Sequence, residues 1–192
     1  MVDKLPFLPD EHHYAIAAVA ARAAQLEATI ETSISILLAA TEKTSAFILK
    51  NMNGDKYVGL LKQMLLDLSP AREDIINKAF PRIAAARTER NEILHWLWGK
   101  SEKPSAAKYT SLRPHREQQE RSKTAAEIQA VADELLELSL VISALVTLSA
   151  KLRPSPYTPG PTVLVADSTW QQMLDLFQSG QSLRRPPAPS QT

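Results

Sequence analysis

The sequence contains no cysteine and only five glycines among its 192 residues. The absence of cysteine excludes disulfide bonds and thiolate zinc ligands, and it fits a reducing compartment. There is no glycine-rich phosphate-binding loop and no motif of a serine hydrolase. These absences exclude several common classes of enzyme, among them the P-loop nucleotide hydrolases.

A strong net charge is also lacking, since the formal value is +1. The chain as a whole is therefore not drawn to nucleic acid, and any such site must be a local patch. One local excess lies at Lys100–Lys123, which holds seven Lys or Arg residues and three Glu residues, a net charge of +4. We expect this stretch to be a long connector with a short extended piece that includes Tyr109 and ends at Pro114. Connectors of this length are uncommon inside compact domains and are often functional.

No apolar run is long enough to cross a membrane. The longest, Leu135–Ala150, includes Glu137 and is shorter than the roughly 20 residues that a membrane span needs. It is typical of a buried bundle helix. The segment Met1–Pro9 has one Lys and no apolar run, so it does not resemble a signal peptide. We therefore expect a soluble, cytoplasmic protein without a membrane partner.

What the sequence does contain is helical periodicity. Hydrophobic residues make up 44% of the chain and recur every three or four positions. This spacing predicts helices over about 10–40, its continuation 41–50, 55–68, 70–98 and 124–152. We predict an all-α fold, a four- to five-helix up-and-down bundle with a long connector before the last core helix. The domain organisation would be an extended lead-in over 1–9, the bundle over 10–152, and a Pro-rich, irregular tail over 153–192.

Local signals mark the ends of these helices. Asn53-Gly54 is typical of a left-handed stop, and Ser69-Pro70 of a helix opening. Pro81 is expected to kink the helix that follows, and Gly99 to end it. The segment Thr124–Glu127 has the form of a capping box. In the tail, Asp167 or Ser168 would cap one short amphipathic helix that stops at Gly180.

Polar groups that can do chemistry cluster late in the helix predicted over 70–98. Arg87, Asn91 and His95 follow one another at intervals of one helical turn. Arg90 stands five residues before His95, which places the two side chains roughly 140° apart around the axis. A cation, an amide and a group that titrates near neutral pH are the parts needed to hold a phosphate and move a proton beside it.

The hexapeptide Arg90-Asn91-Glu92-Ile93-Leu94-His95 resembles the signature of the HEPN superfamily (higher eukaryotes and prokaryotes nucleotide-binding domains). The resemblance covers about Asp10 to Leu152. It implies a helical bundle that forms a homodimer with its two motif helices facing each other, so that Arg90 of one chain approaches His95 of the partner subunit. Many members are metal-independent RNA endonucleases that act as toxins or antiviral effectors. The resemblance therefore implies an endoribonuclease without metal or cofactor, with RNA as substrate and a protein antitoxin or inhibitor as a further partner.

The same resemblance assigns roles to individual residues. His95 would accept the proton of the RNA 2′-hydroxyl, Arg90 would stabilise the charge on the transition state, and Asn91 would orient His95 or a phosphate oxygen. The product would carry a 2′,3′-cyclic phosphate. Tyr109 or Trp98 would be available for base stacking. Further contacts to the substrate would come from Arg87, Lys100, Lys108, Arg113 and Arg116.

Plainer interpretations remain open. In one of them, the Arg and Glu residues of the motif helix form ordinary surface ion pairs, and Trp96 and Trp98 are packing anchors. His12-His13 is a poor chelate and is expected to be solvent-exposed, so no metal site is predicted. A non-catalytic helical dimerisation or protein-interaction module, and a HEPN-like domain that binds nucleotides without cleavage, are the alternative functions.

Overall fold

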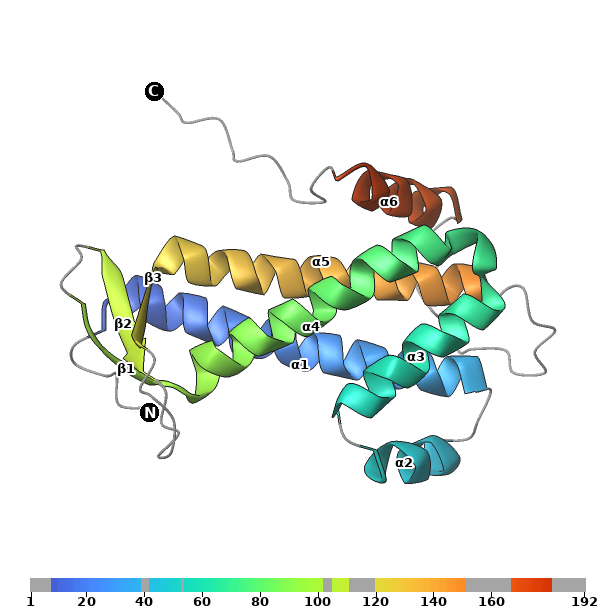
Figure 1. Ribbon diagram of the computed structural model, residues 1–192, viewed down its shortest axis with the longest axis horizontal. Helices are drawn as coiled ribbons and strands as arrows, with labels where there is room; N and C mark the ends of the chain where they lie inside the picture. Colours follow the sequence, from blue (N-terminus) through green and yellow to red (C-terminus); the bar gives the residue numbers. More distant parts are fainter. Residues whose placement is uncertain are drawn as a thin grey trace. The chain divides into compact units, whose positions relative to one another are not determined.

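The predicted all-α class is confirmed, with one small antiparallel sheet added to the helices (Figure 1). The computed structural model describes residues 8–38, 42–52, 54–101, 105–110, 120–150 and 167–180. Its helices are α1 (Asp10–Leu38), α2 (Glu42–Lys50), α3 (Gly54–Leu68), the 3₁₀ turn η1 (Pro70–Arg72), α4 (Glu73–His95), α5 (Ala125–Ala150) and α6 (Asp167–Ser179). In this described part of the chain, every helix is too short or too polar to cross a membrane.

The chain divides into two compact units. The first unit comprises Met1–Leu26 with Arg82–Leu136, and the second comprises Glu27–Pro81 with Glu137–Thr192. Helices α1, α4 and α5 each contribute one segment to the first unit and one segment to the second. The predicted division into lead-in, bundle and tail stays a prediction.

The core of the first unit is built by three helical segments whose apolar residues recur every three or four positions. This spacing places them on one side of each helix, where they are removed from water. The buried residues are Ala15, Val19, Ala23 and Leu26 in α1, Ile83, Ala86 and Ile93 in α4, and Ile128, Val131, Ala132 and Leu135 in α5.

The sheet of the first unit consists of β1 (Leu97–Lys100), β2 (Ala106–Thr110) and β3 (Glu120–Thr124) in that spatial order. Both pairings are antiparallel, and Trp98 lies opposite Tyr109, which in turn lies opposite Arg121. Directly paired residues point to the same face of a sheet. These three side chains therefore form one row across it.

The sheet corrects the sequence interpretation of two residues. The helix predicted to reach Trp98 ends at His95, and Gly99 lies inside β1 instead of ending a helix. The physical reason is the burial of Trp98, whose indole Nε1 donates to the carbonyl oxygen of Ile93 at 2.8 Å. The connector was expected to hold one extended piece at Tyr109. Its described residues include β2 and β3, while residues 102–104 and 111–119 lie outside the described part.

Among the predicted helix-end signals, one is confirmed and two differ in the structure. The capping box at Thr124 is confirmed: its backbone N–H donates to the Glu127 carboxylate at 2.7 Å, and the Glu127 N–H donates to the Thr124 hydroxyl at 3.2 Å. Ser69 makes no side-chain capping bond, because its buried hydroxyl lies 2.6 Å from that of Ser149. Gly54 is the first residue of α3 and not a stop.

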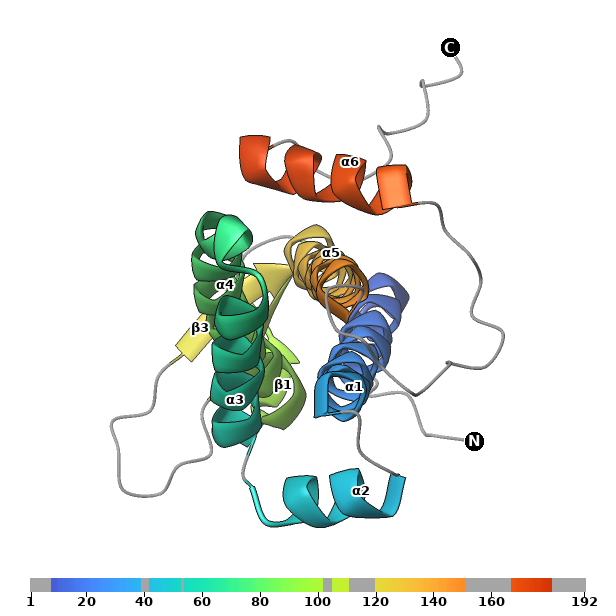
Figure 2. The same cartoon turned by 90° about the vertical axis from the view of Figure 1, so that its right-hand side faces the viewer.

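The second unit includes the short tail helix that the sequence predicts. Figure 2 shows α6 lying across one side of the α4 and α5 segments of this unit. Leu174 and Phe177 of α6 are buried, and Gly180 follows with a positive φ of 77°. The ammonium of Lys78 in α4 donates to the carbonyl oxygens of Phe177 at 3.0 Å and Gln178 at 2.9 Å. Cations are favourable at a helix C-terminus, so Lys78 stabilises the C-terminal end of α6.

Candidate functional site

The last two turns of α4 carry the motif residues, and two of them lie at the surface of the first unit. Asn91 and His95 are exposed, while Arg90 is half-buried. Seven residues advance a helix by almost two full turns, so Arg90 follows Ile83 on the buried side of α4. Its guanidinium Nη1 donates to the Asn91 side-chain oxygen at 2.8 Å. A cation with a partly buried stem is thereby held beside an exposed amide.

The predicted row of polar residues keeps its helical spacing. Arg87, Asn91 and His95 all lie within α4, four residues apart, and therefore share one face. His95 is the last residue of α4, although Trp96 still donates its backbone N–H to the Glu92 carbonyl at 3.1 Å. The exposed imidazole thus stands where the chain leaves the helix. The facing of two motif helices concerns a second copy of the chain and stays a prediction.

Two carboxylates on α4 are paired with cations of strand β3. Arg121 Nη1 lies 2.6 Å from the Glu92 carboxylate, and Lys123 Nζ lies 2.9 Å from that of Glu89. The plainer interpretation expected ion pairs within the motif helix. The pairs of Glu89 and Glu92 instead connect α4 to the sheet. They neutralise both glutamates that flank Arg90, which favours the approach of an anion to this end of the helix.

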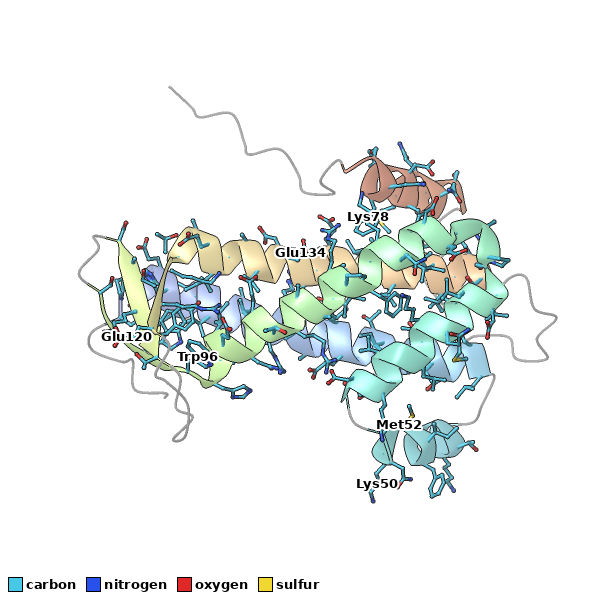
Figure 3. All side chains as sticks on the ribbon, viewed as in Figure 1. Lys50, Met52, Lys78, Trp96, Glu120 and Glu134 are labelled. Atoms are coloured by element: carbon cyan, nitrogen blue, oxygen red, sulfur yellow. The ribbon has the colours of Figure 1, made fainter. Side chains whose placement is uncertain are left out.

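The aromatic residues next to His95 form a cluster. The rings of Trp98 and Tyr109 lie 4.7 Å apart between centroids, and those of Trp96 and Tyr109 lie 5.4 Å apart. Trp98 and Tyr109 are buried, so the suggestion that either is available for base stacking is wrong, and Trp98 is a packing anchor. Trp96, labelled in Figure 3, stays half-exposed. The Arg121 guanidinium carbon lies 5.7 Å from the centre of its ring, within the range of a cation–π contact.

Burial raises the pKa of the Tyr109 phenol, an effect that the nearby charge of Lys123 opposes. The phenol oxygen is buried and has no hydrogen-bond partner among the residues that the structure describes. Loss of contact with water disfavours the phenolate, which is why the pKa rises.

The remaining predicted substrate contacts lie in the connector. Lys108 is in β2 and forms an ion pair with Glu120 at 2.6 Å. It neighbours Tyr109 along the strand and so points to the opposite face of the sheet. Lys100 is the last residue of β1 and its side chain is outside the described part, as are Arg113 and Arg116. A role for these four residues in substrate binding stays a prediction.

His12 is fully buried, which contradicts the expectation that it is exposed. Its Nε2 lies 3.2 Å from the backbone carbonyl of Lys123. The spacing of α1 could have revealed this, because His12 stands three residues before Ala15 and seven before Val19, on the buried stripe. The sequence did not indicate Arg121 as a candidate site residue, because its position beside Trp96 depends on the pairing of β2 with β3. In the part of the chain that the structure describes, no group of three His, Asp or Glu residues is arranged to hold a metal ion.

Comparisons of the chain with models of protein families, with curated proteins and with solved structures find no match.

Proposed function

We propose that this protein is a HEPN-like, metal-independent RNA endonuclease in which Arg90, Asn91 and His95 act on the scissile phosphate. The observation that carries the proposal is the 2.8 Å contact from Arg90 Nη1 to the Asn91 side-chain oxygen, one helical turn before an exposed His95. It places a fixed cation, an amide and an imidazole at one end of α4.

The chemistry follows from these three groups. Neutral His95 accepts the proton of an RNA 2′-hydroxyl while the 2′-oxygen attacks phosphorus. The bond from phosphorus to the 5′-oxygen breaks, and that oxygen takes a proton from water or from the protonated His95 of the partner subunit. Arg90 stabilises the negative charge that develops on the phosphoryl oxygens. The products are a 2′,3′-cyclic phosphate and a free 5′-hydroxyl, and DNA resists because it lacks the attacking group.

The proposal includes a homodimer. Within one helix Arg90 and His95 are roughly 140° apart around the axis, so a single α4 presents them to different sides. A two-fold contact between two α4 helices would bring Arg90 of one chain to His95 of the partner subunit. The shared cleft would contain two guanidinium groups and two imidazoles, a cationic site for a phosphate.

The test is cleavage of a structured RNA and of DNA with the same sequence, in excess EDTA. We expect cleavage of RNA only, with cyclic phosphate ends, and losses of at least about a hundredfold in the His95→Ala and Arg90→Ala proteins. Arg22→Ala is the matched control, because Arg22 also donates to a neighbouring side-chain amide, that of Gln25, at 2.8 Å on a helix. It should cleave like the unaltered protein.

Equal cleavage by the His95→Ala protein, or cleavage that EDTA abolishes, would show that the proposed reaction is wrong. Failure of the unaltered protein to cut any of several RNAs would leave α4 as an interaction surface. The question would then become what binds it.

A further inference from the structure

Four side chains of the first unit form a ladder beside His95. Trp98 packs on Tyr109 at 4.7 Å, Tyr109 on Trp96 at 5.4 Å, and the Arg121 guanidinium lies 5.7 Å from the Trp96 ring. The first two rings are buried and Trp96 is half-exposed, while 50% of the Arg121 side chain is exposed. The ladder therefore leads from the core to the surface at the end of α4.

Both ends of this ladder are fixed by hydrogen bonds. Trp98 Nε1 donates to the Ile93 carbonyl at 2.8 Å, and Arg121 Nη1 donates to the Glu92 carboxylate at 2.6 Å. A guanidinium donates from its edge, in its own plane, so the ion pair with Glu92 does not occupy the faces of Arg121, and the Trp96 ring lies on one side of it. Surfaces that are already ordered cost little conformational entropy when a ligand binds.

We propose that Arg121, which lies over the Trp96 ring, stacks on an unpaired nucleobase of the RNA and so forms a base-binding subsite at the end of α4. Aromatic rings and guanidinium planes are the surfaces on which proteins stack splayed-out bases. Trp96 directly follows His95 in the sequence, so the ladder and the imidazole both belong to the end of α4. In a duplex both faces of each base are already stacked on neighbours, which keeps them from the ladder.

This inference rests on the proposed function, since it adds a base-binding subsite to the same site. Its test is a binding measurement on the His95→Ala protein, which keeps the ladder and does not consume the RNA. The probes are a short single-stranded oligouridine, the same oligomer with abasic riboses, and a duplex RNA of equal charge. The abasic oligomer keeps every phosphate and lacks the bases, so the comparison separates stacking from charge attraction.

We expect the oligouridine to bind roughly tenfold more tightly than the abasic oligomer. In the His95→Ala background, Arg121→Lys should remove this preference, because lysine keeps the charge and the reach to Glu92 but has no plane. Trp96→Leu should remove it as well. Arg82→Lys is the control, since Arg82 forms an Arg–Glu pair with Glu134 at 2.7 Å in the same unit. It should keep the preference.

Equal binding of the oligouridine and the abasic oligomer would overturn the stacking proposal and leave the ribonuclease proposal standing if the unaltered protein cleaves RNA in EDTA. Preference for the duplex would overturn it too, as would a base preference that survives Arg121→Lys. Absence of binding to all three probes, together with absence of cleavage, would overturn both proposals.

Discussion

The indole N–H of Trp98 donates to the backbone carbonyl of Ile93 at 2.8 Å. This bond ties the first strand of the sheet back to the last turn of α4, and it sets the direction in which the chain leaves the helix after His95. The exposed imidazole and the half-exposed Trp96 lie between the two bonded residues in the sequence. The positions of His95 and Trp96 therefore depend on the hydrogen bond between Trp98 and Ile93.

Trp98→Phe should destabilise the protein by about 1–2 kcal/mol. Phenylalanine keeps an aromatic ring against Tyr109 but has no N–H for the carbonyl of Ile93, which is left without that donor. The measurement is the free energy of unfolding in denaturant. Trp170→Phe, at a half-exposed position of α6, is the control and should change it by less than about 0.5 kcal/mol. Equal effects of the two substitutions would contradict the role of the bond.

Tyr109→Phe should leave stability unchanged or raise it by up to about 1 kcal/mol at neutral pH, because it removes a buried hydroxyl that lacks a described partner. The raised pKa of the phenol gives a second expectation. The folded state holds its proton to higher pH than the unfolded state, so stability present below about pH 10 is lost as the pH rises further.

The Tyr109→Phe protein should not lose this part of its folding stability at alkaline pH. Denaturant unfolding between neutral pH and pH values above the ordinary tyrosine pKa measures it. Parallel pH profiles for the two proteins would mean that Tyr109 does not titrate differently in the folded state.

The ion pair of Arg82 and Glu134 should be worth more than that of Lys108 and Glu120. The first is bidentate, with contacts of 2.8 and 2.7 Å and side chains 32% and 25% exposed. The second has 40% and 53% of its side chains exposed. Double-mutant cycles to alanine should give coupling energies of about 1 kcal/mol for the first and below about 0.5 kcal/mol for the second.

Added salt should reduce the coupling of the more exposed pair by the larger fraction, since solvent screens exposed charges more strongly. Figure 3 labels one glutamate of each pair, Glu134 and Glu120. A larger coupling energy for Lys108 and Glu120 would contradict the argument from geometry and exposure.

Lys78→Met should loosen α6. Methionine keeps the apolar stem but loses the ammonium, which donates to the carbonyl oxygens of Phe177 and Gln178 and lies 5.5 Å from the centroid of the Phe177 ring. Amide hydrogen exchange in α6 should become roughly fivefold to tenfold faster, as expected for the loss of about 1 kcal/mol of local stability. Lys62→Met in α3 should leave the exchange of α6 as it is. Unchanged exchange in the Lys78→Met protein would show that the buried Leu174 and Phe177 hold α6 alone.

Much of the helical architecture could be read from the sequence because its causes are local. The apolar stripe from Val19 to Leu26 repeats with the helical period, and Thr124 and Glu127 form a capping box from residues three positions apart. The tail helix was recognisable for the same reason, with an apolar side that ends before Gly180. The row of Arg87, Asn91 and His95 follows from helical spacing as well.

The sheet and the surroundings of the motif depend on contacts between residues far apart in the chain. Tyr109 lies between Trp98 and Arg121 because three short strands pair, and such short segments carry no periodicity strong enough to predict the pairing. The end of α4 at His95 is also decided by tertiary packing, which favours burial of Trp98 over one more turn of helix.

The sequence by itself determined which residues are available for chemistry and which segments are helical, because composition and side-chain periodicity are properties of neighbouring residues. Only the tertiary structure decided that Glu89 and Glu92 are neutralised from β3, that Trp98 and Tyr109 are buried, and that Trp96 and Arg121 remain at the surface beside His95. The reason is physical: burial and ion pairing depend on where distant parts of the chain meet in space.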